Sequence, residues 1–230
     1  MGTKFSTRVW VSVVGIASIF FGSKGYADTV ISVADFGLKP DTRENAVAYV
    51  QKAIEACRGK EPVTLVFPEG RYDFWPQYAH EKNYYETNTY DVFPKRLAML
   101  FEGLHNITVD GNGSQFVMHD RIQPITVENC DGVTLKNFSI DWDIPLTAQA
   151  RVTKVGSDFF EIEINVLESP YIIEDGKLVF VGEGWKSALG SMIEFESDTH
   201  FVVPGTGDLV LGRNWRDYTA VSPRYGIVRL

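Results

Sequence analysis

Two aspartates that flank a tryptophan, Asp141 and Asp143 in the stretch NFSIDWDIP, are the first candidates for chemistry. If this stretch is a strand, the two carboxylates share one face and lie about 6.6 Å apart along it. Glycosidases that invert configuration place their two carboxyl groups about 6.5–9.5 Å apart, which leaves room for the attacking water. The pair could therefore act as acid and base, contact a sugar as helpers, or cap the strand, and the sequence leaves these alternatives open.

Alternation along this stretch predicts which side chains face the core. Phe138, Ile140 and Trp142 share one face of the expected strand, which should be buried. Asp141 and Asp143 then point outward, onto the surface. One of the two carboxyl groups would need a raised pKa to donate a proton, and no feature of the sequence indicates such a shift.

Three further side chains are candidates for substrate binding: His119, Arg121 and Trp75. Arg121 could hold a sugar hydroxyl or orient a carboxylate, or form a surface ion pair with Asp120 that contributes little free energy. Trp75 opens a polar, aromatic segment, 75–93, that we interpret as a long loop. Loops of this length are uncommon without a task, so this one could wall a sugar pocket or pack on the helix side.

Composition argues against several classes of ligand. The net charge of −8 makes nucleic acid a poor partner, because its binding requires a basic face. The four histidines show no metal-ligand spacing, and two cysteines cannot complete a structural zinc site, so we expect neither metal nor cofactor. Cys57 and Cys130 are expected as free thiols, with a disulfide as the alternative. An aromatic content of 13% suits sugar binding, although most such rings pack in cores.

The elements that must position these residues change along the chain. The first 27 residues have a basic start, an apolar run and small residues before the expected cut after Ala27, so they are interpreted as a secretory signal peptide. Residues 42–58 are predicted to form an amphipathic helix, with a capping box made by Asp41 and Glu44 and a stop at Gly59. The stretch PVTLVFPEGRYDF predicts two strands around a Pro-Glu-Gly turn.

Two stretches from residue 102 onward, EGLHNITVDGNG and ENCDGVTLKNFS, superpose with a shift of 26 residues. Such a repeat is typical of the stacked coils of a parallel β-helix, and the helix 42–58 would cover the open end of the stack. After Pro145 the pattern predicts hairpins, including one with its turn at 156–158. We therefore expect a mainly β protein: a cap and first coils over 28–145, and an antiparallel meander or small barrel inserted over 146–230.

The segments VADFGLKPDTRENAVAYVQKAIEAC and LVFPEGRYDF resemble the N-terminal cap of the pectate-lyase-like, right-handed parallel β-helix superfamily. A longer stretch, 100–152, with its His-Asp-Arg and SIDWD motifs, resembles glycoside hydrolase family 110, the exported bacterial α-1,3-galactosidases. That resemblance implies an exported enzyme that removes terminal α-1,3-linked galactose from blood-group-B-type or linear glycans with inversion, without a metal. Family members are much longer, so the chain is expected to be an N-terminal fragment whose true acid and base follow Leu230.

Two other functions compete with this expectation. A polysaccharide lyase on the same fold would need basic residues or calcium near its cleft, which an acidic chain fits poorly. A non-catalytic carbohydrate-binding β-helix, or an inactive fragment, would bind glycan without releasing galactose. After removal of the leader, no stable membrane insertion is expected, and the sequence does not predict an oligomeric state.

Overall fold

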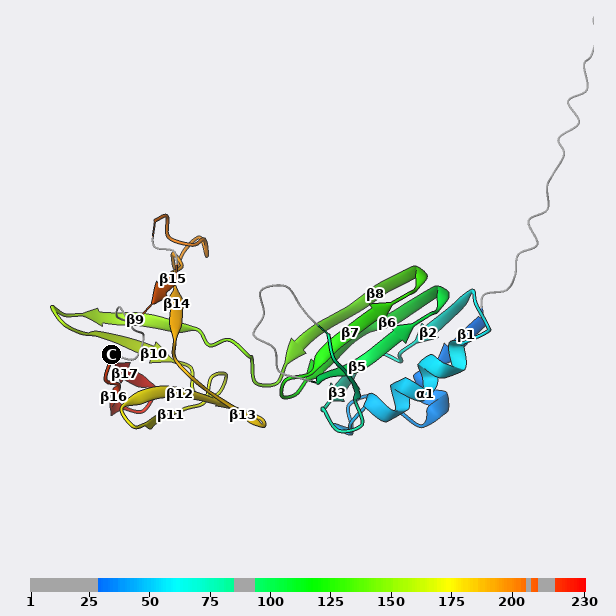
Figure 1. Ribbon diagram of the computed structural model, residues 1–230, viewed down its shortest axis with the longest axis horizontal. Helices are drawn as coiled ribbons and strands as arrows, with labels where there is room; N and C mark the ends of the chain where they lie inside the picture. The colour runs from blue at the N-terminus through cyan, green and yellow to red at the C-terminus, as the bar shows by residue number, and fades with distance from the viewer. Residues whose placement is uncertain (1–28, 85–93, 206–207, 211–217) are drawn as a thin grey trace, which may run out of the picture.

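The computed structural model describes residues 29–84, 94–205, 208–210 and 218–230. The expected signal peptide, 1–27, and the part of the expected loop over 85–93 lie outside these residues. The fold is mainly β, and Figure 1 shows two groups of strands joined by the connection 143–149. The N-terminal group contains β1–β8 and the single α-helix of the described residues, and the C-terminal group contains β9–β17.

The N-terminal group forms two small sheets. The first has the order β1-β2-β6-β3, with β8 paired to β6, and the second has the order β4-β5-β7. Every pair is parallel except β4 with β5. The elements are β1 (Thr29–Ser32), a 3-10 helix (Val33–Phe36), α1 (Val47–Cys57), β2 (Val63–Val66), β3 (Arg71–Phe74), β4 (His80–Lys82), β5 (Lys95–Glu102), β6 (His105–Met118), β7 (Gln123–Glu128) and β8 (Asp131–Trp142).

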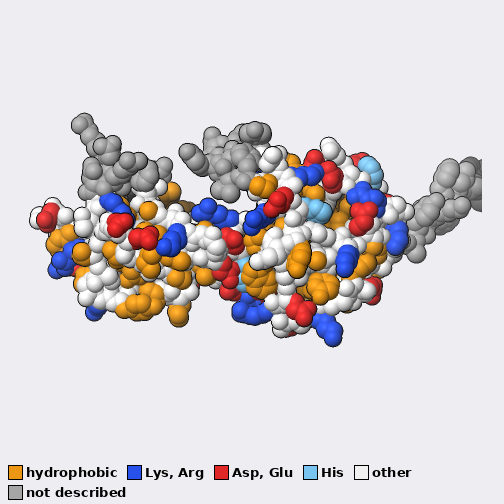
Figure 2. Space-filling view, turned by 60° about the horizontal axis from the view of Figure 1, so that its bottom comes forward, with side chains coloured by type: hydrophobic (Ala, Val, Ile, Leu, Met, Phe, Trp, Pro, Cys, Tyr) orange, Lys and Arg blue, Asp and Glu red, His pale blue; other side chains and the backbone are white. Residues whose placement is uncertain are grey.

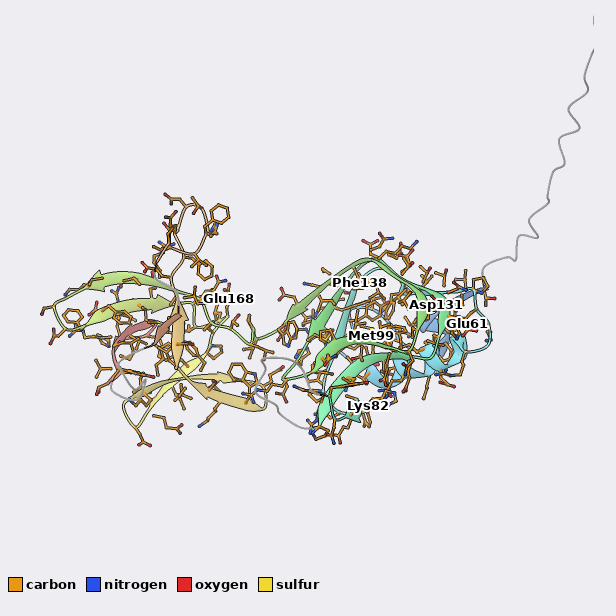
Figure 3. All side chains as sticks on the ribbon, turned by 45° about the horizontal axis from the view of Figure 1, so that its top comes forward. Glu61, Lys82, Met99, Asp131, Phe138 and Glu168 are labelled. Atoms are coloured by element: carbon orange, nitrogen blue, oxygen red, sulfur yellow. The ribbon has the colours of Figure 1, made fainter. Side chains whose placement is uncertain are left out.

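The 26-residue repeat is confirmed as a structural ladder. Residues that superpose in the sequence are register partners on parallel neighbours, as for Ile107 with Val133 on β6 and β8. Glu102 and Glu128 are partners on β5 and β7, and the Lys82 ammonium lies 2.7 and 2.9 Å from their carboxylates. Figure 3 labels Lys82 at the edge of this sheet. The pair is half exposed, so we assign these contacts to the register of β4 and attribute little stability to them.

Helix α1 begins later than the sequence predicted. Asp41 and Arg43 have positive φ angles of 61° and 57°, which no α-helix accommodates, so the expected capping box of Asp41 and Glu44 is wrong. The side chain of Asn45 instead accepts a hydrogen bond from the backbone N–H of Val47. The helix ends at Cys57, and Gly59 follows with φ +73°, as expected of a helix stop.

One core holds the N-terminal group together. The apolar stripe of α1 is buried against the strands, and Figure 1 shows the helix lying along the side of the sheet that contains β1 and β2. Phe116 on β6 is fully buried, and its ring centroid lies 4.7 Å from that of Phe67 and 5.7 Å from that of Phe74. Phe138, labelled on β8 in Figure 3, stacks on Phe116 at 4.7 Å.

Strand β8 departs from the expected pattern because it is an edge strand. Phe138 and Trp142 pack on the core, as predicted, but Ile140 from the same face is 38% exposed. No described strand pairs with the outer edge of β8. Alternation places a side chain on the core face, and a neighbouring strand is still needed to cover it.

The C-terminal group is antiparallel, as predicted, and has its own core around Ile162, Leu178 and Val228. Its strands are β9 (Ala150–Val155), β10 (Phe160–Ile164), β11 (Tyr171–Glu174), β12 (Lys177–Gly182), β13 (Trp185–Ala188), β14 (Ser191–Ile193), β15 (Asp208–Val210), β16 (Val221–Arg224) and β17 (Ile227–Arg229). The hairpins β9–β10 and β11–β12 lie where the sequence predicted them. Among the described residues, no helix is long and apolar enough to cross a membrane.

Cys57 and Cys130 are both free, as expected. Cys57 is buried on α1, whereas Cys130 is half buried. Burial raises the pKa of the Cys57 thiol to about 11, so this side chain behaves as a small apolar residue of the core.

Candidate functional site

The candidate site lies where three parallel strands end side by side. Strands β3, β6 and β8 are in register up to their last residues: Phe74, Met118 and Trp142. The ladder continues for one more residue, because the backbone N–H of His119 donates to Phe74 and that of Asp143 donates to Met118. Trp75, His119 and Asp143 therefore follow three neighbouring strands at one edge of the sheet. Three residues that are distant in the sequence meet here.

His119 is buried between two carboxylates. Its Nε2 lies 2.8 Å from Asp73 Oδ1, and its Nδ1 lies 2.7 Å from Glu183 Oε2. The Trp75 ring stacks on the imidazole at 3.8 Å between ring centroids. Because a carboxylate only accepts hydrogen bonds, the ring nitrogens must be the donors in these contacts. In this arrangement His119 has no free nitrogen for a sugar hydroxyl.

Trp75 is fixed through the backbone. The side-chain oxygen of Asn45 accepts a hydrogen bond from the backbone N–H of Trp75, and its amide nitrogen donates to the carbonyls of Trp75 and Gln77. Asn45 also makes the first hydrogen bond of α1, so one side chain ties the start of the helix to the end of β3.

Arg71 and Asp73 share one face of β3 and form the charged centre of the site. Arg71 Nη2 lies 2.5 Å from Asp73 Oδ1 and 2.7 Å from Asp143 Oδ1, so one guanidinium bridges two carboxylates. Burial by itself raises the pKa of Asp73, but the hydrogen bonds from Arg71 and His119 outweigh burial and hold this pKa below its ordinary value. The hydrogen bond to Asp73 raises the pKa of Arg71, which burial opposes.

The site opens to solvent on one side. The side chains of Asp73 and His119 are at most 2% exposed, whereas those of Arg71, Asp143 and Glu183 are 25%, 31% and 36% exposed. Figure 2 shows acidic and histidine side chains gathered at the junction between the two groups of strands. Charged donors and acceptors with exposed atoms can hydrogen-bond sugar hydroxyls more strongly than neutral groups do.

A metal-ligand pattern is present in space, although the sequence showed none. Ligand atoms of Asp73, His119 and Asp143 lie within 4.8 Å of one another. However, Arg71 Nη2 already lies within hydrogen-bond distance of both carboxylates, so the guanidinium is the cation that they share. The donor set as arranged therefore fits an internal ion pair better than a metal ion, which would have to displace Arg71.

The remaining predicted residues lie close to this cluster but outside it. Arg121 makes no printed ion pair with Asp120, contrary to that alternative: its guanidinium lies over the Trp185 ring at 5.7 Å, and Asp120 accepts a hydrogen bond from the Arg121 backbone. Asp141 is exposed and accepts from the backbone N–H of Trp142. Asp143 joins the cluster through Arg71, so the structure brings only one of the two aspartates into it.

Sequence reasoning missed Arg71, Asp73 and Glu183. The first two lie two residues apart in GRYDF, a spacing that places them on one strand face and could have drawn attention to them. Glu183 follows a glycine in the turn between β12 and β13 and carries no such signal. It reaches His119 only because the C-terminal group lies against the end of β6.

Comparison with known proteins identifies relatives of the chain. Residues 148–230 match a family described as GLAA-B beta-barrel domain I. The chain is 57% identical over 204 residues to alpha-1,3-galactosidase B of Bacteroides thetaiotaomicron, an alignment that covers 89% of the chain and 33% of the relative. It is 36% identical to alpha-1,3-galactosidase A of Shewanella woodyi, over 73% of the chain and 28% of the relative. It is also 36% identical to alpha-1,3-galactosidase B of Phocaeicola vulgatus, over 87% and 32%.

These matches agree with the resemblance carried by the His-Asp-Arg and SIDWD motifs. The chain spans about a third of the length of the curated relatives that it matches. The family match over 148–230 coincides with the antiparallel group of strands. The chain is therefore a homologue, over that third, of proteins named alpha-1,3-galactosidases.

Proposed function

We propose that this chain is part of an exported glycoside hydrolase that removes terminal α-1,3-linked galactose from glycans with inversion. The observation that carries the proposal is the 57% identity over 89% of the chain to a protein named alpha-1,3-galactosidase B. Because the matched region is a third of that relative, the activity of the whole protein belongs to this proposal. We expect the blood-group-B-type or linear α-galactosyl glycans as substrates.

The fold that we propose is a right-handed parallel β-helix with α1 as its cap. The in-register parallel pairs β2–β6–β8 and β5–β7, separated by 26 residues, support stacked coils. We further propose that 28–145 and 146–230 are separate units, supported by their two separate cores. An experimental structure in which the strands wind left-handedly would overturn the β-helix proposal.

Within this enzyme, we assign Arg71 and Asp143 to glycan binding. Both are partly exposed, charged, and held in place by the buried Asp73. Asp143 is a poor general acid, because its ion pair with Arg71 favours the charged carboxylate, whereas an acid must carry a proton. The proposed general acid and base then lie among residues that the longer relatives have in addition to the matched third.

The test uses galactosyl-α-1,3-galactose and nuclear magnetic resonance of the reaction. Release of galactose whose β-anomer appears first supports an inverting hydrolase, and first appearance of the α-anomer refutes inversion. Saturation of the protein by the disaccharide without release of galactose would refute catalysis by this chain. Asp143→Asn should weaken binding about tenfold or more through loss of a charged hydrogen bond, whereas Asp198→Asn, on the exposed turn before β15, should not change it.

Export is proposed from the basic and apolar pattern of residues 1–27. Mass spectrometry of the protein secreted by a bacterial host should find a mature N-terminus at Asp28. A product that retains residues 1–27 after fractionation would contradict cleavage.

A further inference from the structure

Two short turns, one from each group of strands, contact each other closely. The turn after β6 contributes His119–Arg121, and the turn between β12 and β13 contributes Glu183–Trp185. Glu183 pairs with His119 at 2.7 Å, and Arg121 lies over the Trp185 ring at 5.7 Å. A Cβ built on Gly184 would lie 2.5 Å from Asp120 Oδ2, so this approach requires a glycine. Consecutive residues of one turn thus contact consecutive residues of the other.

The contact of Glu183 leads directly into the candidate glycan site. His119 joins Glu183 to Asp73, Asp73 holds Arg71, and Arg71 holds Asp143. Four hydrogen-bonded pairs thus connect the C-terminal group to the exposed Asp143 carboxylate. Asp73 and His119 are buried, and buried charged groups need every partner, since a missing one is not replaced by water.

We infer that Glu183 is a positioning residue for the glycan site. It fixes the His119 ring from the side that faces the C-terminal group, and His119 in turn fixes the carboxylate of Asp73 on which Arg71 is oriented. The C-terminal group is therefore a part of the site and not merely a neighbouring module. The effect on glycan binding rests on the proposed function, whereas the fixing of His119 does not.

The matched variants are Glu183→Ala, Glu183→Gln and Glu174→Gln. Glu174 lies on β11 and makes an exposed ion pair with Lys186 at 3.2 Å, so it controls for loss of a negative charge from the same group of strands. Glutamine at position 183 keeps an oxygen that accepts a hydrogen bond, whereas alanine keeps none. A purely electrostatic effect would make Glu183→Gln resemble Glu183→Ala.

The first readout is the His119 ring in nitrogen-15 magnetic resonance. In the wild-type chain and in Glu174→Gln, the Nδ1–H proton should exchange slowly with water, because it is buried against Glu183. In Glu183→Ala this signal should be lost to fast exchange, and Glu183→Gln should restore it. A slowly exchanging Nδ1–H in Glu183→Ala would overturn the inference.

The second readout is hydrogen exchange of the His119 backbone amide, which donates to Phe74 at 2.9 Å. Loss of a hydrogen bond to a charged group should raise its exchange rate about tenfold or more in Glu183→Ala. Glu183→Gln should stay within about threefold of wild type on the same reasoning. Equal rates in Glu183→Ala and Glu174→Gln would refute the positioning role.

The third readout is the dissociation constant for galactosyl-α-1,3-galactose, which should rise in Glu183→Ala and recover in Glu183→Gln. If the wild-type chain binds no disaccharide, the proposed function fails, and the two readouts on His119 still decide the inference. If the wild type binds and Glu183→Ala binds equally well, the link from Glu183 to the glycan site is refuted.

Discussion

Replacement of Asp73 by asparagine should destabilise the fold strongly while it preserves the shape of the side chain. Asp73 is 1% exposed and accepts hydrogen bonds from the Arg71 guanidinium and from His119 Nε2. A hydrogen bond to a charged group contributes about 1.5–3 kcal/mol, and removal of one partner from a buried charge pair costs about 3–5 kcal/mol. Asparagine keeps one accepting oxygen, so we expect a loss of about 3 kcal/mol in the free energy of unfolding.

The assay is urea unfolding followed by tryptophan fluorescence, because Trp75 stacks on His119 and reports on this part of the molecule. Asp141→Asn is the matched control: Asp141 is exposed and outside the cluster, and surface changes of this kind stay within about 0.5 kcal/mol. If Asp73→Asn and Asp141→Asn unfold at the same urea concentration, the buried ion network does not contribute to stability as argued here.

The difference between wild type and Asp73→Asn should also depend on pH. The folded state lowers the pKa of Asp73, although burial alone would raise it. A carboxyl group of this kind stabilises the fold above its unfolded pKa of about 3.9 and loses this contribution as the pH falls through its folded pKa. The difference should be full at pH 7 and shrink as the pH is lowered from about 5 to about 2. A difference that stays constant down to the acid limit contradicts this assignment.

Three further predictions address the fold. Phe116→Ala should lower the free energy of unfolding by about 3–5 kcal/mol in urea, because the ring is fully buried among other aromatic rings, and a loss below 1 kcal/mol would contradict that packing. Gly111→Ala should destabilise by about 1–3 kcal/mol, since the new Cβ would lie 2.5 Å from Phe138 Cβ; unchanged unfolding would show that β8 adapts. Cys57, with a raised pKa of about 11, should resist iodoacetamide in the folded chain at pH 8 and react after denaturation, as mass spectrometry of its peptide can show.

Local patterns predicted much of the N-terminal group. Strands β2 and β3, the body of α1 and the 26-residue ladder between β6 and β8 follow from alternation, helical spacing and repetition. The start of α1 did not follow from them, because the positive φ angle at Asp41 depends on a distant contact: its carboxylate accepts from the backbone N–H of Arg71. A capping motif in the sequence cannot reveal such a competing partner.

The sequence alone determined the candidates His119, Trp75 and Asp143, and the elements on which each lies. Only the tertiary structure decided that they meet, because register between β3, β6 and β8 brings their ends to one edge. It also decided that Asp143 enters the cluster and Asp141 does not, and that Arg71, Asp73 and Glu183 complete it. Alternation is a property of one strand, whereas a charged cluster requires several segments whose separation in the sequence carries no trace of their contact.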